Sequence, residues 1–127
     1  MIKHSYCEVY VKYVLPAIRL LIAKELIEKH GYTQLEVAKA LGISQPLLNY
    51  YLTGRRSPKH LSKIAASERI SKIVRYFANC VKKDEECAEK LPCTLCRVLK
   101  ESGEANRIIK AIGMEPESVI FPLCLAP

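Results

Sequence analysis

The sequence contains no tryptophan and only two phenylalanines among 127 residues, so a core must be built from aliphatic side chains and tyrosine. It also lacks a membrane-spanning run, because Arg19 and Lys24 interrupt the most apolar stretch well short of about 18 residues. The N-terminus has no apolar segment followed by a small-residue cleavage site. These absences predict one small domain located in the cytoplasm.

Recognisable catalytic patterns are missing as well. The chain has no glycine-rich phosphate loop, no paired carboxylates and no Ser/His/Asp set. A thiol oxidoreductase using Cys93 and Cys96 is a weak alternative, because no βαβ pattern surrounds this pair. We therefore expect neither an enzyme nor a small-molecule substrate.

Positive charge is concentrated in the first two thirds of the chain. The formal net charge is +7. Residues 1–83 carry 15 Lys and Arg against 5 Asp and Glu, a net +10, whereas residues 84–127 carry 5 against 8, a net −3. This asymmetry favours a polyanionic partner for residues 1–83, with a merely solvated basic surface as the alternative.

Helical periodicity dominates the apolar pattern and predicts an all-α fold. Apolar residues between Val14 and Leu26 recur at helical spacing, and Gly31 ends this helix. The pattern extends back to Tyr6, which indicates a preceding helix that is kinked or broken at Pro16. Because the residues there are aromatic and β-branched, a strand is the alternative.

Two short helices joined by a glycine turn follow, which is typical of a helix-turn-helix. Thr33 and Glu36 have the spacing of a capping box, and Gly42 supplies the turn. Ser44 caps the second helix, which Gly54 ends. Ala38 is small where the helices cross, and Ile43, Leu48 and Tyr51 pack inward. The side chains that this arrangement leaves facing a major groove are Ser44, Gln45, Asn49 and Tyr50.

The segment "TQLEVAKALGISQPLLNYYLTGRRSP" resembles the Xre or phage-repressor class of helix-turn-helix transcription regulators. Residues 7–100 also resemble small archaeal predicted regulators, in which a helix like "LPAIRLLIAKEL" comes first and a C-x-x-C element follows. The resemblance implies sequence-specific binding to double-stranded DNA. It implies phosphate contacts for Gln34, Arg55 and Arg56, and contacts to bases or backbone for Ser44, Gln45, Asn49 and Tyr50. Pro46 and Leu47 depart from the polar residues common in the class.

The segment from Pro58 to about residue 83 predicts one long amphipathic helix. Its apolar face is larger than a small bundle needs, which favours a homodimer seam, with burial inside the monomer as the alternative. The run "KKDEE" then reads as a polar linker, followed by helices over 94–101 and 104–112 and at most one short strand. Together these features predict a helix-turn-helix bundle of about five helices over 1–83 and a small cysteine-rich extension over 84–127.

The extension raises the question of what its cysteines do. Intracellular cysteines that lie close together are more often metal ligands than disulfides. The spacing resembles iron–sulfur regulators more than zinc sites, which usually use two C-x-x-C pairs. An iron–sulfur cluster, or zinc, would act as a redox or iron sensor or as a structural staple. The expected ligands are Cys80, Cys87, Cys93 and Cys96, with Cys124 as a substitute for Cys80.

Disulfides and free thiols stay open as alternatives for the same cysteines, and the sequence assigns no role to Cys7. A protein- or RNA-binding adaptor of the antitoxin kind, stabilised by disulfides or zinc, is the second functional hypothesis.

Overall fold

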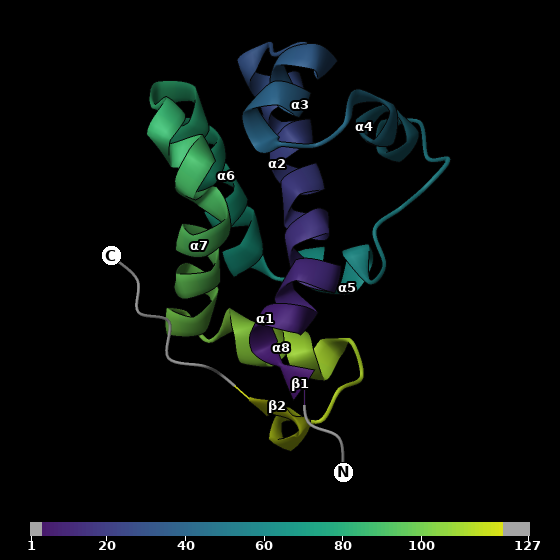
Figure 1. The fold of residues 1–127 in the computed structure, drawn as a ribbon, viewed down its shortest axis with the longest axis vertical. Helices are drawn as coiled ribbons and strands as arrows, with labels where there is room; N and C mark the ends of the chain where they lie inside the picture. Colours follow the sequence, from purple (N-terminus) through teal and green to yellow (C-terminus); the bar gives the residue numbers. More distant parts are fainter. Residues whose placement is uncertain (1–3, 121–127) are drawn as a thin grey trace.

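The computed structural model describes residues 4–120 of the chain, which form an all-α bundle with one short pair of strands (Figure 1). The all-α prediction is therefore confirmed. The helices are α1 (Tyr6–Val9), a π-helical turn (Tyr10–Val14), α2 (Leu15–His30), α3 (Gln34–Leu41), α4 (Gln45–Leu52), α5 (Leu61–Ala65), α6 (Glu68–Lys83), α7 (Glu85–Glu101) and α8 (Glu104–Ala111), followed by a short 3-10 helix (Pro116–Ser118). The strands β1 (His4–Ser5) and β2 (Val119–Ile120) pair in parallel.

The central rod of the molecule consists of α1, the π-helical turn and α2 in direct succession (Figure 1). The chain does not break at Pro16, which occupies the first turn of α2. Proline has no N–H to donate, and in the widened turn before it the Leu15 N–H instead bonds to the Tyr10 carbonyl. The helical interpretation of this segment is confirmed, and the strand alternative is wrong.

The prediction of one helix from Pro58 to residue 83 is wrong, because Ser67 divides the segment into α5 and α6. Ser67 is extended (φ −91°, ψ 136°), and its hydroxyl accepts a 3.1 Å hydrogen bond from the Arg69 N–H. A serine hydroxyl that bonds to a nearby backbone N–H in this way favours the start of a new helix over a continuous helix through the serine.

The apolar face of α6 is covered within the chain, since α6 packs between α2 and α7. Its buried residues are Ile70, Ile73, Val74, Phe77, Ala78 and Val81. The structure thus shows the alternative interpretation of this face, burial in the monomer.

The run "KKDEE" is not a linker, and the prediction that a helix starts near Thr94 is wrong. Asp84 both ends α6 and begins α7, and its carboxylate accepts a 2.9 Å hydrogen bond from the Glu86 N–H. Two further acidic residues, Glu85 and Glu86, lie in the first turn, where negative charge complements the helix dipole. The helix then continues through Pro92 to Glu101.

Helices α7 and α8 complete the core rather than forming an appendage. Leu91 and Leu95 from α7, and Ile108 from α8, belong to the same buried cluster as the residues of α2. Arg107 of α8 also donates hydrogen bonds to the carbonyls of Lys63 (3.1 Å) and Ile64 (2.8 Å) in α5. The prediction of a helix over 104–112 is confirmed. Within residues 4–120, no helix combines the length and the apolarity needed to cross a bilayer.

Candidate nucleic-acid interface

Helices α3 and α4 form the predicted helix-turn-helix. Gly42 has the left-handed conformation (φ 67°), and its N–H and that of Ile43 both bond to the Ala38 carbonyl, which closes the turn. Ala38 and Leu48 are buried where the helices meet. A side chain at residue 42 would strain this backbone, so glycine sets the angle at which α4 is presented.

The start of α3 is fixed by the predicted capping box. The Thr33 N–H donates to Glu36 Oε1 (3.0 Å), and the Glu36 N–H donates to Thr33 Oγ1 (3.1 Å). The hydrogen bond from the Thr33 backbone, followed by that from its side chain, lowers the pKa of Glu36. This carboxylate therefore stays ionised and holds the first turn in place, with Gln34 as the first helical residue.

The candidate contact residues lie mostly on the exposed face of α4 and on the loop that follows it. Ser44 is exposed, but its hydroxyl is occupied as the helix cap, accepting a 3.3 Å hydrogen bond from the Leu47 N–H. Gln45 is exposed, and Tyr50 is 39% exposed. Tyr51 instead packs against the core, as expected.

Gln34 and Asn49 are joined to each other, a contact that the sequence did not reveal. Asn49 Nδ2 donates to Gln34 Oε1 at 3.3 Å, and both side chains are partly buried. A residue expected at the phosphates is thereby coupled to one expected at the bases.

Arg55 and Arg56 are exposed on the turn after α4. Their backbone N–H groups both bond to the Tyr50 carbonyl, at 2.9 and 3.2 Å. Gly54 makes the turn possible with φ 77°. The backbone is therefore fixed while both guanidinium groups point into solvent, as phosphate contacts require.

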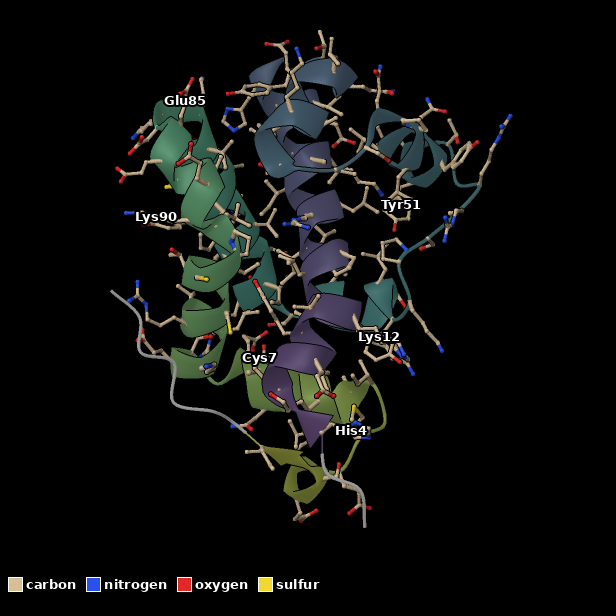
Figure 2. The ribbon with its side chains drawn as sticks, in the orientation of Figure 1. His4, Cys7, Lys12, Tyr51, Glu85 and Lys90 are labelled. Atoms are coloured by element: carbon tan, nitrogen blue, oxygen red, sulfur yellow. A yellow bond between two sulfur atoms is a disulfide. The ribbon has the colours of Figure 1, made fainter. Side chains whose placement is uncertain are left out.

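A second basic cluster, which sequence reasoning missed, surrounds Tyr13 below this loop, in the region of Lys12 in Figure 2. Lys12 Nζ lies 5.3 Å and Lys59 Nζ 5.9 Å from the centre of the Tyr13 ring, and the His60 ring packs edge-on to it at 5.3 Å. Partial burial, with the charges of Lys63 and Lys59, lowers the pKa of His60. The lysines alone therefore carry the positive charge here at neutral pH.

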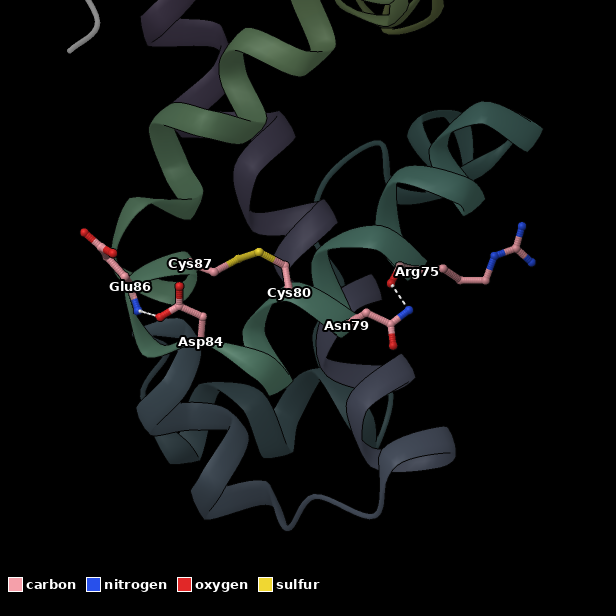
Figure 3. The surroundings of a disulfide bond; sticks show 6 residues. All are labelled: Arg75, Asn79, Cys80, Asp84, Glu86 and Cys87. Carbon is pink, nitrogen blue, oxygen red and sulfur yellow. Dashed lines mark hydrogen bonds between the residues drawn. A yellow bond between two sulfur atoms is a disulfide. The ribbon is translucent and has the colours of Figure 1, made fainter.

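The cysteines are arranged differently from the predicted ligand set. Cys80 and Cys87 form a disulfide that joins the end of α6 to the start of α7, with Cα atoms 5.9 Å apart (Figure 3). Cys93 is an exposed thiol and Cys96 a buried one on α7, while Cys7 on α1 is partly buried. Cys124 lies outside the described residues.

A single metal or cluster does not fit this arrangement of sulfurs. Cys96 lies nine positions after Cys87 in α7, which places the two about 13.5 Å apart along the helix axis and on opposite faces. In residues 4–120 no group of three or more His, Cys, Asp or Glu side chains comes together as a metal site. Ligation by Cys80, Cys87, Cys93 and Cys96 would require an open disulfide and an unwound α7. It stays a prediction.

Comparison with known proteins supports the helix-turn-helix assignment. A family model described as helix-turn-helix matches residues 24–67. No curated protein and no solved structure matches the chain. The matched range begins within α2, contains α3 and α4, and ends at the Ser67 cap of α6. Residues 24–67 of this chain are therefore a helix-turn-helix domain.

Proposed function

We propose that the chain is a sequence-specific DNA-binding transcription regulator that places α4 in the major groove. The observation that supports this most directly is the polarity of α4 itself. Leu48 anchors the helix in the core, while Gln45 and Tyr50 face solvent beside the exposed Arg55 and Arg56. Such a surface combines groups that read base edges with cations that neutralise phosphates.

Each part of this surface has its own role in the proposal. Arg55 and Arg56 hold the backbone and set the register of α4. The Gln45 amide reads a base edge, with adenine as its preferred partner. Asn49 contacts DNA while keeping its hydrogen bond to Gln34, so that the Gln34 amide is directed toward the adjacent phosphate.

The protein would act where DNA is found, in the cytoplasm, and would bind two half-sites as a homodimer, as helix-turn-helix regulators do. The dimer surface is not the buried face of α6. We assign the Cys80–Cys87 disulfide the role of a staple that holds α6 and α7 together beside the helix-turn-helix. The likeness to small archaeal regulators and the iron–sulfur or zinc site both stay predictions.

The test is a selection of preferred sites from random duplex DNA, followed by binding measurements over a range of salt. Replacing Arg55 and Arg56 with alanine should weaken binding to all sequences and reduce the salt slope by about 2, since each lost phosphate contact accounts for about 0.9. The matched control removes two exposed cations elsewhere, Arg75 and Lys110, and should leave the slope nearly unchanged.

Two results would reject the proposal. One is a double arginine variant that binds random DNA as tightly as the unmodified protein. The other is tighter binding to single-stranded RNA than to any selected duplex, which would favour the adaptor hypothesis instead.

A further inference from the structure

A cleft of about 790 Å³ lies between the helix-turn-helix and the corner where α6 meets α7. One wall comes from α3 and its turn, including Lys39 and Leu41, and the other from Val81, Ala88 and Pro92. Arg19 of α2 also lines it. The volume falls within the range of small-molecule sites, and the walls combine apolar surface with charged groups.

Arg19 is the unusual residue of this cleft. It lies on the stripe of α2 that faces the core, one turn from Leu15 and from Ile22, both of which are buried. Its Nε atom is buried and finds no hydrogen-bond partner within residues 4–120. Burial raises the pKa of the nearby Tyr10, and the charge of Arg19 opposes part of that rise. A buried donor without a partner costs free energy, so an acceptor that bonded to the Arg19 Nε–H would stabilise the protein.

The acidic residues of the cleft do not supply that acceptor. Glu36 is held by the Thr33 capping box, and Asp84 caps α7 through the Glu86 N–H. Glu85 and Glu89 are exposed at the rim, and neither forms an ion pair with Arg19 in the described part of the chain. The guanidinium group is therefore free to pair with an anion from outside the protein.

We propose that this cleft binds a small organic anion. A carboxylate or phosphate would pair with Arg19, and an apolar body would lie against Leu41, Val81 and Pro92. The planar guanidinium fork suits the two oxygens of either group, and pairing would satisfy the Nε–H. Binding itself does not depend on DNA. Only an effect of the ligand on α3, and through it on operator affinity, rests on the proposed function.

The experiment is a titration of the full chain, followed by amide and arginine side-chain nuclear magnetic resonance. The probes are benzoate and phenyl phosphate, and acetate and inorganic phosphate serve as the same head groups without an apolar body. We expect saturable shifts of the Arg19 Nε–H and of the Gly42 and Ala88 amides at millimolar concentrations. The aromatic anions should bind at least about tenfold more tightly than their head groups. The aromatic probe that binds more tightly identifies the natural head group as carboxylate or phosphate.

Two variants test the role of the guanidinium. Arg19→Gln should weaken probe binding at least about tenfold, and Arg19→Lys, which keeps the charge but loses the fork, should weaken it less. Arg75→Gln removes an exposed arginine of α6 that lies outside the cleft, and this variant should bind the probes as the unmodified protein does. If Arg19→Gln does not fold, weaker probe binding by Arg19→Lys than by the unmodified protein is the result that supports the role of the guanidinium group. The proposal is overturned by a lack of saturable shifts with both aromatic probes, by head groups that bind as tightly, or by full binding in the Arg19 variants.

Discussion

The hydroxyl of Tyr10 donates a 2.7 Å hydrogen bond to the carbonyl of Pro92, 82 residues away in the sequence. Tyr10 is a buried residue of the π-helical turn, and Pro92 lies inside α7. The bond ties the N-terminal rod to the cysteine-bearing helix at the point where proline interrupts the helical hydrogen bonds of α7. It is one reason that residues 84–120 belong to the same core as the helix-turn-helix.

Removing this hydroxyl should destabilise the protein. Tyr10→Phe keeps the ring but loses the hydrogen bond, and we expect the free energy of unfolding to fall by about 1 kcal/mol. Urea denaturation followed by circular dichroism measures the change. Tyr76→Phe is the matched control, because the Tyr76 side chain is 62% exposed and its substitution should change little. Equal stabilities for the two variants would show that the bond contributes nothing in solution.

Alkaline pH should destabilise the fold through Tyr6 and Tyr10. Burial, with the nearby Cys96, raises the pKa of both tyrosines above the usual value of 10.0. Below pH 10.0 both the folded and the unfolded states keep these protons, so this contribution is fully present. Above it the unfolded state loses protons first, and stability falls by about 1.4 kcal/mol per pH unit for each tyrosine.

The measurement is the unfolding free energy from pH 8 to about 12. The unfolding free energy of Tyr10→Phe should fall less steeply with pH than that of the unmodified protein, by the about 1.4 kcal/mol per pH unit that one tyrosine contributes. Identical slopes in the two proteins would mean that Tyr10 ionises as readily in the folded state as in the unfolded one.

The parts of the structure that the sequence predicted are those decided by neighbours in the chain. Thr33 with Glu36, Gly42 and Ser44 fix the helix-turn-helix through contacts within four residues, and all appear as expected. The exposure of Arg55 and Arg56 likewise follows from a local turn.

The parts that escaped prediction depend on distant contacts or on a choice between two local states. Ser67 could sit inside a helix or cap one, and the pattern of apolar residues fits both. Pro92 inside α7 accompanies a contact with Tyr10 that no local pattern reveals. Arg19 did leave a signal, since a charge on the apolar stripe of α2 is unusual, but its meaning needed the cleft. The pairing of Cys80 with Cys87 followed only once α7 was known to begin at Glu85.

Opening the Cys80–Cys87 disulfide should lower stability. The bond closes a short loop, and the chain-entropy relation gives about 2–3 kcal/mol for it at 25 °C. Cys80→Ser, Cys87→Ser and the double variant should each lose about the same amount, because either single change removes the whole bond. Cys93→Ser is the control, since this thiol is exposed and unpaired.

Reductant should lower the stability of the unmodified protein to that of the variants and leave the variants unchanged. If the single variants are as stable as the unmodified protein, the disulfide is not a staple. Iron or zinc found in stoichiometric amounts in protein prepared without air would instead favour the ligand set of four cysteines.

The hydrogen bond between Gln34 and Asn49 should make their contributions to DNA binding interdependent. Asn49→Ala removes its own contact with DNA and also releases the Gln34 amide from the position in which it meets the backbone. Gln34→Ala removes a phosphate contact and leaves Asn49 without its partner. The double variant should therefore lose less affinity for the selected site than the sum of the two single losses, by about 0.5–1.5 kcal/mol. Equilibrium binding to one operator at fixed salt gives the four affinities.

The control cycle combines Asn49→Ala with Arg56→Ala, whose side chains share no hydrogen bond in residues 4–120, and should be additive within about 0.5 kcal/mol. Additivity in the Gln34 and Asn49 cycle as well would show that DNA breaks this hydrogen bond when it binds, and that the two residues act independently.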